Sequence, residues 1–171
     1  LIETELETFQ FYQRYLKKEY NIALPDYFFS KKAGRKSTDF FDAALTKQQK
    51  KVVNVGKLIA LKRKLFNTKI EQFVKKVPHG VAVVKQLSKK GYTLAIVSQN
   101  ERRMVDTAID WLHIRKYFKC FITLDDVRPH KKPDPKLYLL AAERLQLQPE
   151  NCGAVEDSPD GIVSAKRAGM Y

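Results

Sequence analysis

Residues 153–161, Gly-Ala-Val-Glu-Asp-Ser-Pro-Asp-Gly, carry the strongest fold signal in this chain of 171 residues. Ala154 and Val155 are typical of the end of a buried strand. Ser158 is a favoured N-cap, and Pro159 suits the first helical position, where no N–H group is needed. The stretch therefore predicts a strand, an acidic tip and a helix. In open α/β sheets, ligands bind beyond the carboxyl ends of the strands, where this tip is expected.

Two adjacent carboxylates, Glu156 and Asp157, occupy the predicted tip. They repel each other and are costly to bury unpaired, so a cation is a natural partner. Their hard oxygen atoms favour magnesium or a similar ion. The same residues also suit an acidic turn that only caps the following helix, and the stretch alone leaves both interpretations open.

Strand and helix patterns alternate after Pro78. The apolar run Thr93–Val97 is typical of a strand that is buried on both faces. Two more strands are expected over 119–123 and 152–155, and helices over 81–90, 98–112, 135–145 and 159–168. This alternation predicts an α/β fold, in which a parallel sheet has helices on both faces.

Residues 8–77 have a different character, because their apolar residues recur at helical spacings and no strand pattern occurs before Lys76. We expect several helices here, including a long proline-free helical segment over Thr46–Lys76. The predicted domains are a discontinuous core, formed by 1–7 and 78–171, and a helical module formed by 8–77. The module could cover a site at the sheet as a lid.

The formal net charge of +13 could attract nucleic acid, anionic lipid or small phosphorylated substrates. Basic residues cluster between Lys31 and Lys76, but they alternate with apolar helical positions and lack a zinc-finger or RNA-recognition signature. A solvated helical face is therefore favoured, and nucleic-acid binding is not expected. No apolar run could cross a bilayer, so no membrane partner is expected. Cys120 and Cys152 are too few for a disulfide framework, which favours reduced thiols and a cytoplasmic location.

Two further residues follow strand patterns. The hydroxyl of Ser98 and the N–H groups of Gln99 and Asn100 could bind an anion at a helix N-terminus. Ser98 could equally form a capping box with Glu101, and the two interpretations are compatible. Lys132 lies in a proline-stiffened loop, where its ammonium could hold a phosphoryl group or an acidic nucleophile, or could simply be solvated.

The segments Val97–Asn100, Lys131–Pro135 and Val155–Ile162 resemble, in order and spacing, motifs two, three and four of the haloacid dehalogenase-like hydrolase superfamily. The resemblance is closest to the branch with beta-phosphoglucomutase and phosphoglycolate phosphatases. It implies a Rossmann-like parallel sheet core with an inserted α-helical cap. It also implies magnesium-dependent hydrolysis of a small phosphomonoester through an aspartyl-phosphate.

Carried over by position, the resemblance implies roles for eight residues. They are catalytic roles for Ser98 and Lys132, substrate binding by Gln99, Asn100, Gly34 and Arg35, and Mg²⁺ binding by Glu156 and Asp157. Asp157 is expected to be the surer of the two metal ligands.

The first motif of the superfamily, Asp-x-Asp-Gly-Thr/Val, carries the nucleophile and a second carboxylate. It is expected immediately before Leu1, because Leu1–Glu5 resembles the segment that follows it. Its strand is expected between those that end at Val97 and Val155. We therefore expect these residues to be part of a longer protein and, by themselves, to bind magnesium poorly and to be inactive.

Other functions stay open at this point. A phosphomutase of the same branch would need the second aspartate of the first motif. A non-catalytic protein could bind polyanions through the basic helical module. A dehalogenase is disfavoured, because Glu156 and Asp157 suit a metal that dehalogenases do not use.

Overall fold

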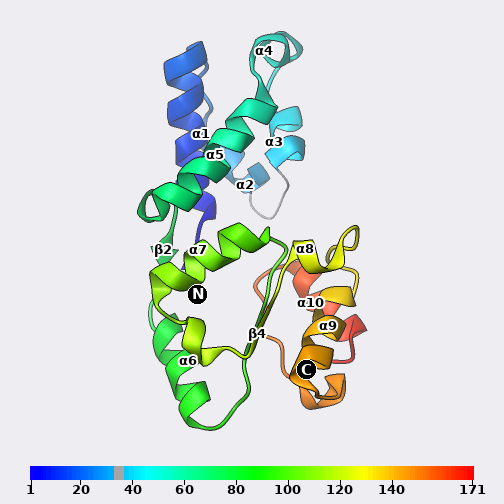
Figure 1. Cartoon of the computed structure of the whole chain (residues 1–171). Coiled ribbons are helices and arrows are strands. Elements are labelled where there is room, and N and C mark those ends of the chain that lie inside the picture. The colour runs from blue at the N-terminus through cyan, green and yellow to red at the C-terminus, as the bar shows by residue number, and fades with distance from the viewer. Residues whose placement is uncertain (33–36) are drawn as a thin grey trace. The chain divides into compact units, whose positions relative to one another are not determined.

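The computed structural model describes residues 1–32 and 37–171, and the chain divides into two compact units, Leu1–Val77 and Pro78–Tyr171 (Figure 1). The division falls at the predicted end of the helical module. Residues 1–7 lie in the first unit, and their predicted place in the core stays a prediction.

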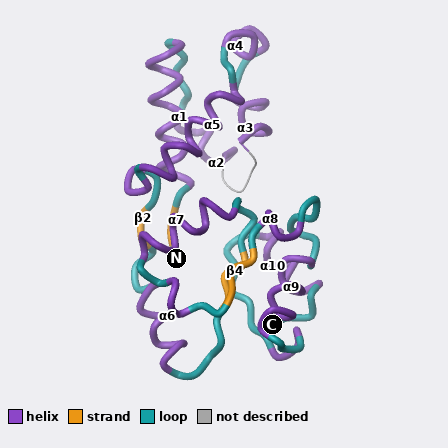
Figure 2. Tube along the Cα trace, viewed as in Figure 1, coloured by secondary structure: helices purple, strands orange, loops and turns teal. Residues whose placement is uncertain are grey.

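The first unit is mainly helical, as Figure 2 shows. Its helices are α1 (Glu5–Tyr20), α2 (Phe29–Lys32), α3 (Ser37–Ala44), α4 (Lys47–Val52) and α5 (Val55–Thr68), with short 3-10 turns η1 (Asp26–Phe28) and η2 (Ile70–Gln72). Its core is rich in aromatic rings, because Tyr12 of α1 packs against Phe40 and Phe41 of α3. The Tyr12 and Phe41 centroids are 4.8 Å apart in an edge-to-face arrangement, a favourable geometry for aromatic pairs.

The long helical segment expected over Thr46–Lys76 is broken at two points. Val53 is extended, and the side chain of Asn54 accepts a hydrogen bond from the Lys57 N–H at 2.8 Å, which starts α5 as a new helix. After η2 the chain becomes a short strand, β2 (Lys75–Lys76), which pairs antiparallel with β1 (Ile2–Glu3). The expectation of no strand up to Lys76 is therefore wrong at its last two residues.

The second unit contains a two-stranded parallel sheet of β3 (Ala95–Val97) and β4 (Cys120–Ile122), in which Ala95 pairs with Cys120. In Figure 1, α6 and α7 lie on one side of these strands and α9 and α10 on the other, which confirms the α/β architecture. The helices are α6 (Gly80–Lys89), α7 (Arg102–Leu112), α8 (Leu124–Val127), α9 (Lys136–Leu145) and α10 (Pro159–Arg167), with 3-10 turns η3 (Arg115–Tyr117) and η4 (Pro149–Asn151). Throughout the described residues, no helix is long and apolar enough to cross a membrane.

The strand predicted over 152–155 is not formed. Its backbone bonds instead to the last residue, because the Ala154 N–H donates to the Tyr171 carbonyl at 2.8 Å and the Tyr171 N–H donates to the Cys152 carbonyl. Val155 is fully exposed rather than buried. β3 is half-buried, where burial on both faces was expected.

One boundary near the predicted site also differs from expectation. The helix expected from Ser98 begins at Arg102, because Glu101 is extended and forms the N-cap without a side-chain hydrogen bond. The capping box between Ser98 and Glu101 is therefore wrong. After Thr123 the chain forms the short helix α8, because Thr123 and Asp126 form a capping box there.

Candidate active site

The centre of the candidate site is an ion pair between Lys132 and Glu156. Lys132 is only 6% exposed, and its ammonium contacts Oε1 of Glu156. The same ammonium lies 3.3 Å from the Tyr138 hydroxyl and 5.0 Å from the centroid of the Tyr138 ring. Burial of a lysine is tolerated when its charge is paired and hydrogen-bonded, and both conditions hold here. The interpretation of Lys132 as a solvated loop residue, which the sequence left open, is therefore wrong.

Glu156 is held from three directions. The Tyr138 hydroxyl donates to Oε1, and the Ser158 hydroxyl donates to Oε2 at 3.1 Å. Burial by itself would raise the pKa of Glu156, but the hydrogen bonds from Lys132 and Tyr138 outweigh it and hold the pKa below its ordinary value. Glu156 is thus kept as a carboxylate in a largely buried position.

Helix α10 starts where this carboxylate is held. Ser158 is its N-cap and accepts a hydrogen bond from the Gly161 N–H at 3.1 Å, as the sequence predicts. A Cβ atom added at Gly161 would overlap the Glu156 carboxylate. Gly161 is therefore needed because Glu156 approaches the first turn of the helix closely.

The loop that carries Lys132 is fastened to α9 and α10. Asp134 accepts a hydrogen bond from the Lys136 N–H at 2.8 Å, while the N-cap of α9 is Pro135, so the helix begins one residue later than predicted. The other carboxylate oxygen of Asp134 lies 2.8 Å from Nδ1 of His130, while the Asp134 carbonyl accepts from the buried Ser164 hydroxyl at 2.7 Å. The Lys136 N–H, and next His130, hold the pKa of Asp134 below its ordinary value. These bonds fix the backbone on the C-terminal side of the lysine.

Ser98 follows β3, and its N–H continues the ladder by donating to the Ile122 carbonyl at 2.9 Å. Its hydroxyl accepts a hydrogen bond from the Asn100 N–H at 3.1 Å, so that amide is engaged within the turn. Gln99 and Asn100 are exposed. The preceding residue, Val97, packs in the same apolar cluster as Tyr138, which brings the end of β3 to α9, the helix whose Tyr138 contacts Lys132 and Glu156.

Asp157 is exposed beside the buried Glu156. An exposed carboxylate is a suitable ligand for a hard cation such as magnesium, whereas the oxygens of Glu156 already accept hydrogen bonds. Over residues 1–32 and 37–171, no three His, Cys, Asp or Glu side chains gather into a group that could hold a metal. Asp157 is thus the more exposed of the two predicted ligands, and the magnesium site stays a prediction. Gly34 and Arg35 lie outside the described residues.

Sequence reasoning missed Tyr138, which appeared only as one of the residues of a predicted helix. The Lys-x-x-x-x-x-Tyr spacing could have indicated it, because it places the ring on the first turn of the helix that follows the lysine loop. Tyr138 is 5% exposed. Its pKa is raised above its ordinary value by burial and then by Glu156, so the phenol keeps its proton.

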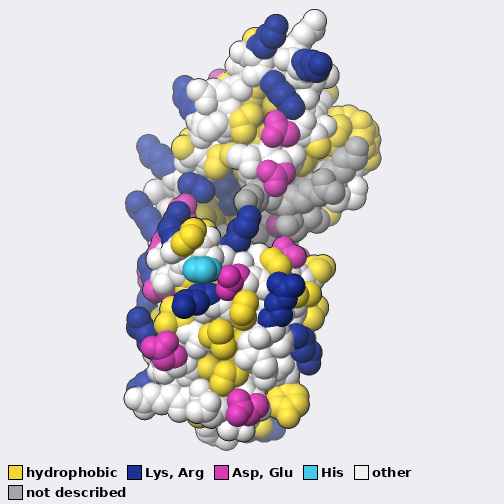
Figure 3. Space-filling view, turned by 90° about the vertical axis from the view of Figure 1, so that its right-hand side faces the viewer, with side chains coloured by type: hydrophobic (Ala, Val, Ile, Leu, Met, Phe, Trp, Pro, Cys, Tyr) yellow, Lys and Arg dark blue, Asp and Glu magenta, His cyan; other side chains and the backbone are white. Residues whose placement is uncertain are grey.

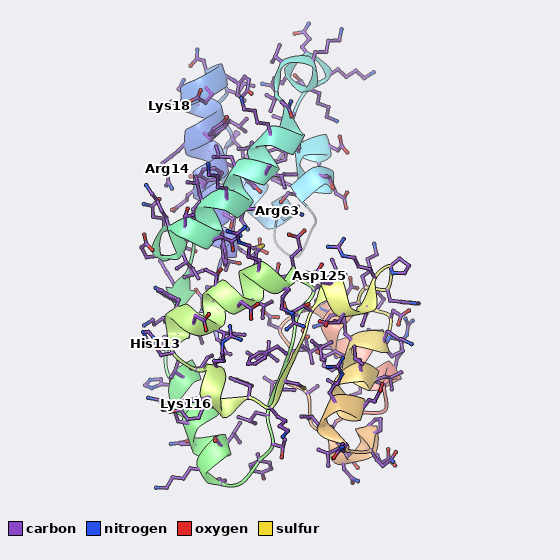
Figure 4. The ribbon with its side chains drawn as sticks, viewed as in Figure 1. Arg14, Lys18, Arg63, His113, Lys116 and Asp125 are labelled. Atoms are coloured by element: carbon purple, nitrogen blue, oxygen red, sulfur yellow. The ribbon has the colours of Figure 1, made fainter. Side chains whose placement is uncertain are left out.

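Asp125 and Asp126 have structural partners. Asp125, labelled in Figure 4 at the start of α8, accepts a hydrogen bond from the Arg102 N–H at 2.7 Å. Asp126 accepts from the N–H and the hydroxyl of Thr123, both at 2.7 Å, and from the Arg102 guanidinium. Asp125 and Asp126 thus form an ordered junction between β4, α7 and α8.

The family model described as haloacid dehalogenase-like hydrolase matches residues 1–171. The chain belongs to the haloacid dehalogenase-like hydrolase family. A structure of a haloacid dehalogenase-like family protein, SP0104 from Streptococcus pneumoniae, superposes with a TM-score of 0.77 at 19% identity and covers 99% of this chain and 77% of that one. CbbY from Rhodobacter sphaeroides, solved in complex with phosphate, gives a TM-score of 0.74 at 20% identity and covers 99% of this chain and 79% of its own. At these identities the two structures show the shared fold.

Curated relatives are more similar in sequence. A CBBY-like protein from Arabidopsis thaliana is 39% identical over 111 residues, which are 64% of this chain and 35% of the relative. Fructose-1-phosphate phosphatase YqaB from Escherichia coli is 35% identical over 77 residues, which are 45% of this chain and 40% of the relative. This haloacid dehalogenase-like chain thus spans well under two thirds of the length of these relatives.

Proposed function

We propose that the full-length protein is a magnesium-dependent phosphatase that hydrolyses a small phosphomonoester. The observation that carries the proposal is the buried Lys132 ammonium, held by Glu156 beside the exposed carboxylate of Asp157. Ser98 follows β3, whose last residue, Val97, packs in the same apolar cluster as Tyr138, so a cation, a carboxylate and a hydroxyl come from three segments that are far apart in the sequence. Such a combination suits phosphoryl transfer, in which positioning and charge stabilisation supply most of the catalysis.

Each residue has a role in this proposal. Lys132 holds the attacking carboxylate and a phosphoryl oxygen as a compact positive charge. The Ser98 hydroxyl donates to another phosphoryl oxygen, and the exposed Gln99 and Asn100 contribute to substrate binding beside it. Asp157 holds Mg²⁺, which when bound neutralises negative charge on the phosphoryl group. Glu156 keeps Lys132 in place and would be the second ligand of the metal.

The nucleophile belongs to the full-length protein. The aspartate of the first family motif is expected ahead of Leu1, and it would form the aspartyl-phosphate that water then hydrolyses. The activity is therefore proposed for the whole protein, because this chain spans only part of the length of its relatives.

The proposed substrate class rests on the chemistry of the candidate site and on the sequence similarity to a sugar-phosphate phosphatase. YqaB is named as a phosphatase of fructose 1-phosphate, a small phosphorylated sugar, and we propose a substrate of the same class. Gly34 and Arg35 are proposed to contact it from the helical module. The cytoplasmic location predicted from Cys120 and Cys152 is part of the same proposal.

The test is turnover of p-nitrophenyl phosphate by the full-length protein, with magnesium and with a chelator in its place. The expected result is phosphate release that needs magnesium. Absence of turnover together with salt-sensitive RNA binding would contradict the proposal and favour polyanion binding. On the face shown in Figure 3, Asp and Glu side chains lie among the Lys and Arg side chains, an arrangement that suits polyanion binding less well than a purely basic surface does. Conversion of one sugar phosphate to its isomer without phosphate release would indicate a phosphomutase.

A further inference from the structure

Tyr138 contacts both members of the buried ion pair. Its hydroxyl donates to Oε1 of Glu156, and the Lys132 ammonium lies 3.3 Å from the same hydroxyl oxygen. The ammonium also lies over the ring, 5.0 Å from its centroid. The Tyr138 side chain is therefore both a hydrogen-bond acceptor and an aromatic neighbour of the Lys132 ammonium.

The two hydrogen bonds of the phenol are compatible with each other. A phenol has one proton to donate and lone pairs to accept with, so it can donate to the carboxylate while it accepts from the ammonium. The phenol, the ammonium and the carboxylate thus form a network in which each group is hydrogen-bonded to the other two.

The position of Tyr138 makes this network rigid. The residue lies in the first turn of α9 and is 5% exposed. It packs with Ala142 in α9, with Ala165 in α10 and with Val97 at the end of β3. Since the ring is fixed by two helices and a strand, the hydroxyl has a defined place relative to Lys132.

We propose that Tyr138 is a positioning residue for Lys132. The Tyr138 hydroxyl and the Lys132 ammonium both donate to Oε1 of Glu156, and the ammonium also donates to the hydroxyl oxygen. These contacts hold the ammonium at a fixed point and use only one of its N–H donors on the carboxylate. Of the three N–H donors of the ammonium, one contacts Glu156 and one contacts Tyr138, and the third stays available for a phosphoryl oxygen or for the attacking carboxylate. This inference rests on the proposed phosphatase function and adds a residue that acts through Lys132.

The first test is Tyr138→Phe in the full-length protein, which keeps the ring and removes only the hydroxyl. With p-nitrophenyl phosphate and magnesium, kcat is expected to fall about tenfold while KM changes less than about twofold, because a misplaced lysine weakens the transition state more than substrate binding. Tyr92→Phe is the matched control, since Tyr92 is 63% exposed and lies outside the site. Circular dichroism and Tm establish that each variant is folded.

The second test separates positioning from a general structural role. If Tyr138 acts through Lys132, then Tyr138→Phe lowers kcat in the wild type but has no further effect in a Lys132→Ala background. Tyr138→Gln, which restores a donor and an acceptor without the ring, is expected to recover part of the kcat lost in Tyr138→Leu.

Each outcome decides the question. An unchanged kcat in Tyr138→Phe, or an equal loss in both backgrounds, overturns the inference and leaves the proposed function intact. Absence of turnover in the wild type overturns the proposed function, and the inference falls with it.

Discussion

Lys132 and Glu156 are 24 residues apart in the sequence, and the ammonium of the first contacts Oε1 of the second in a largely buried position. The contact joins the loop before α9 to the segment before α10. The sequence only suggests that these two polar residues lie near each other, whereas in the structure they form an ion pair. Most of the site's expected behaviour follows from that pair.

Replacement of Lys132 by methionine is expected to destabilise the protein. The change leaves the Glu156 carboxylate buried without its cation, and breaking a buried pair in this way costs roughly 3 kcal/mol. Urea unfolding at neutral pH measures the effect. Lys131→Met is the control, because Lys131 is exposed. Equal midpoints for the two variants would contradict the importance of the pair.

Replacement of Gly161 by alanine is expected to displace the Glu156 carboxylate, because the new Cβ would overlap it. Overpacking of this kind costs roughly 1–3 kcal/mol. Gly153→Ala is the matched control, since a Cβ at Gly153 meets nothing within 4 Å. Thermal unfolding of both variants is the measurement, and a Gly161→Ala variant as stable as Gly153→Ala would show that Glu156 is not held as described.

Replacement of Asp126 by asparagine is expected to lower the free energy of unfolding at neutral pH. It is also expected to make the free energy of unfolding fall less steeply as the pH is lowered. Burial would raise the pKa of Asp126, but bonds from Thr123 and Arg102 outweigh it, so the folded-state pKa lies below the unfolded value. Such a group stabilises the fold above the unfolded pKa, and this contribution is lost as the pH falls through the folded pKa.

Urea unfolding of the wild type and Asp126→Asn, at pH 7 and at about pH 3, measures this loss. The stability difference between the two proteins should be smaller at the lower pH. The exposed Asp39, changed to asparagine, serves as the control. A difference that does not shrink on acidification would show that the Asp126 carboxylate contributes nothing through its charge.

The sequence predicted the elements whose signals are local. Ser158 is recognisable as a cap because a short polar side chain precedes proline at a helix start, and its hydroxyl accepts the expected Gly161 N–H. The apolar runs before Ser98 and Thr123 predicted the parallel pair of β3 and β4 for the same reason.

The sequence failed where the outcome depends on a distant partner. Val155 has a strand-like pattern, but its segment bonds to Tyr171 and its side chain is exposed. Tyr138 has the helical spacing of a core residue, and only the fold reveals that its hydroxyl meets Glu156. Such contacts depend on tertiary packing, which local patterns do not encode.

The site residues themselves were named from motif resemblance, and their roles stay predictions. Lys132 and Glu156 are adjacent in the structure, whereas the sequence assigned them to different tasks, phosphate binding and metal binding. The pairing indicates that Glu156 serves the lysine first and leaves the exposed Asp157 as the better-suited magnesium ligand.

The most direct test of this account is a magnesium titration of phosphatase turnover in the full-length protein, comparing the wild type with Asp157→Asn. The account predicts a much lower kcat for the variant, at least about tenfold, and a higher magnesium concentration for half-maximal rate. Identical titration curves for the two proteins would remove Asp157 from the metal site and contradict the proposed function of this edge of the sheet.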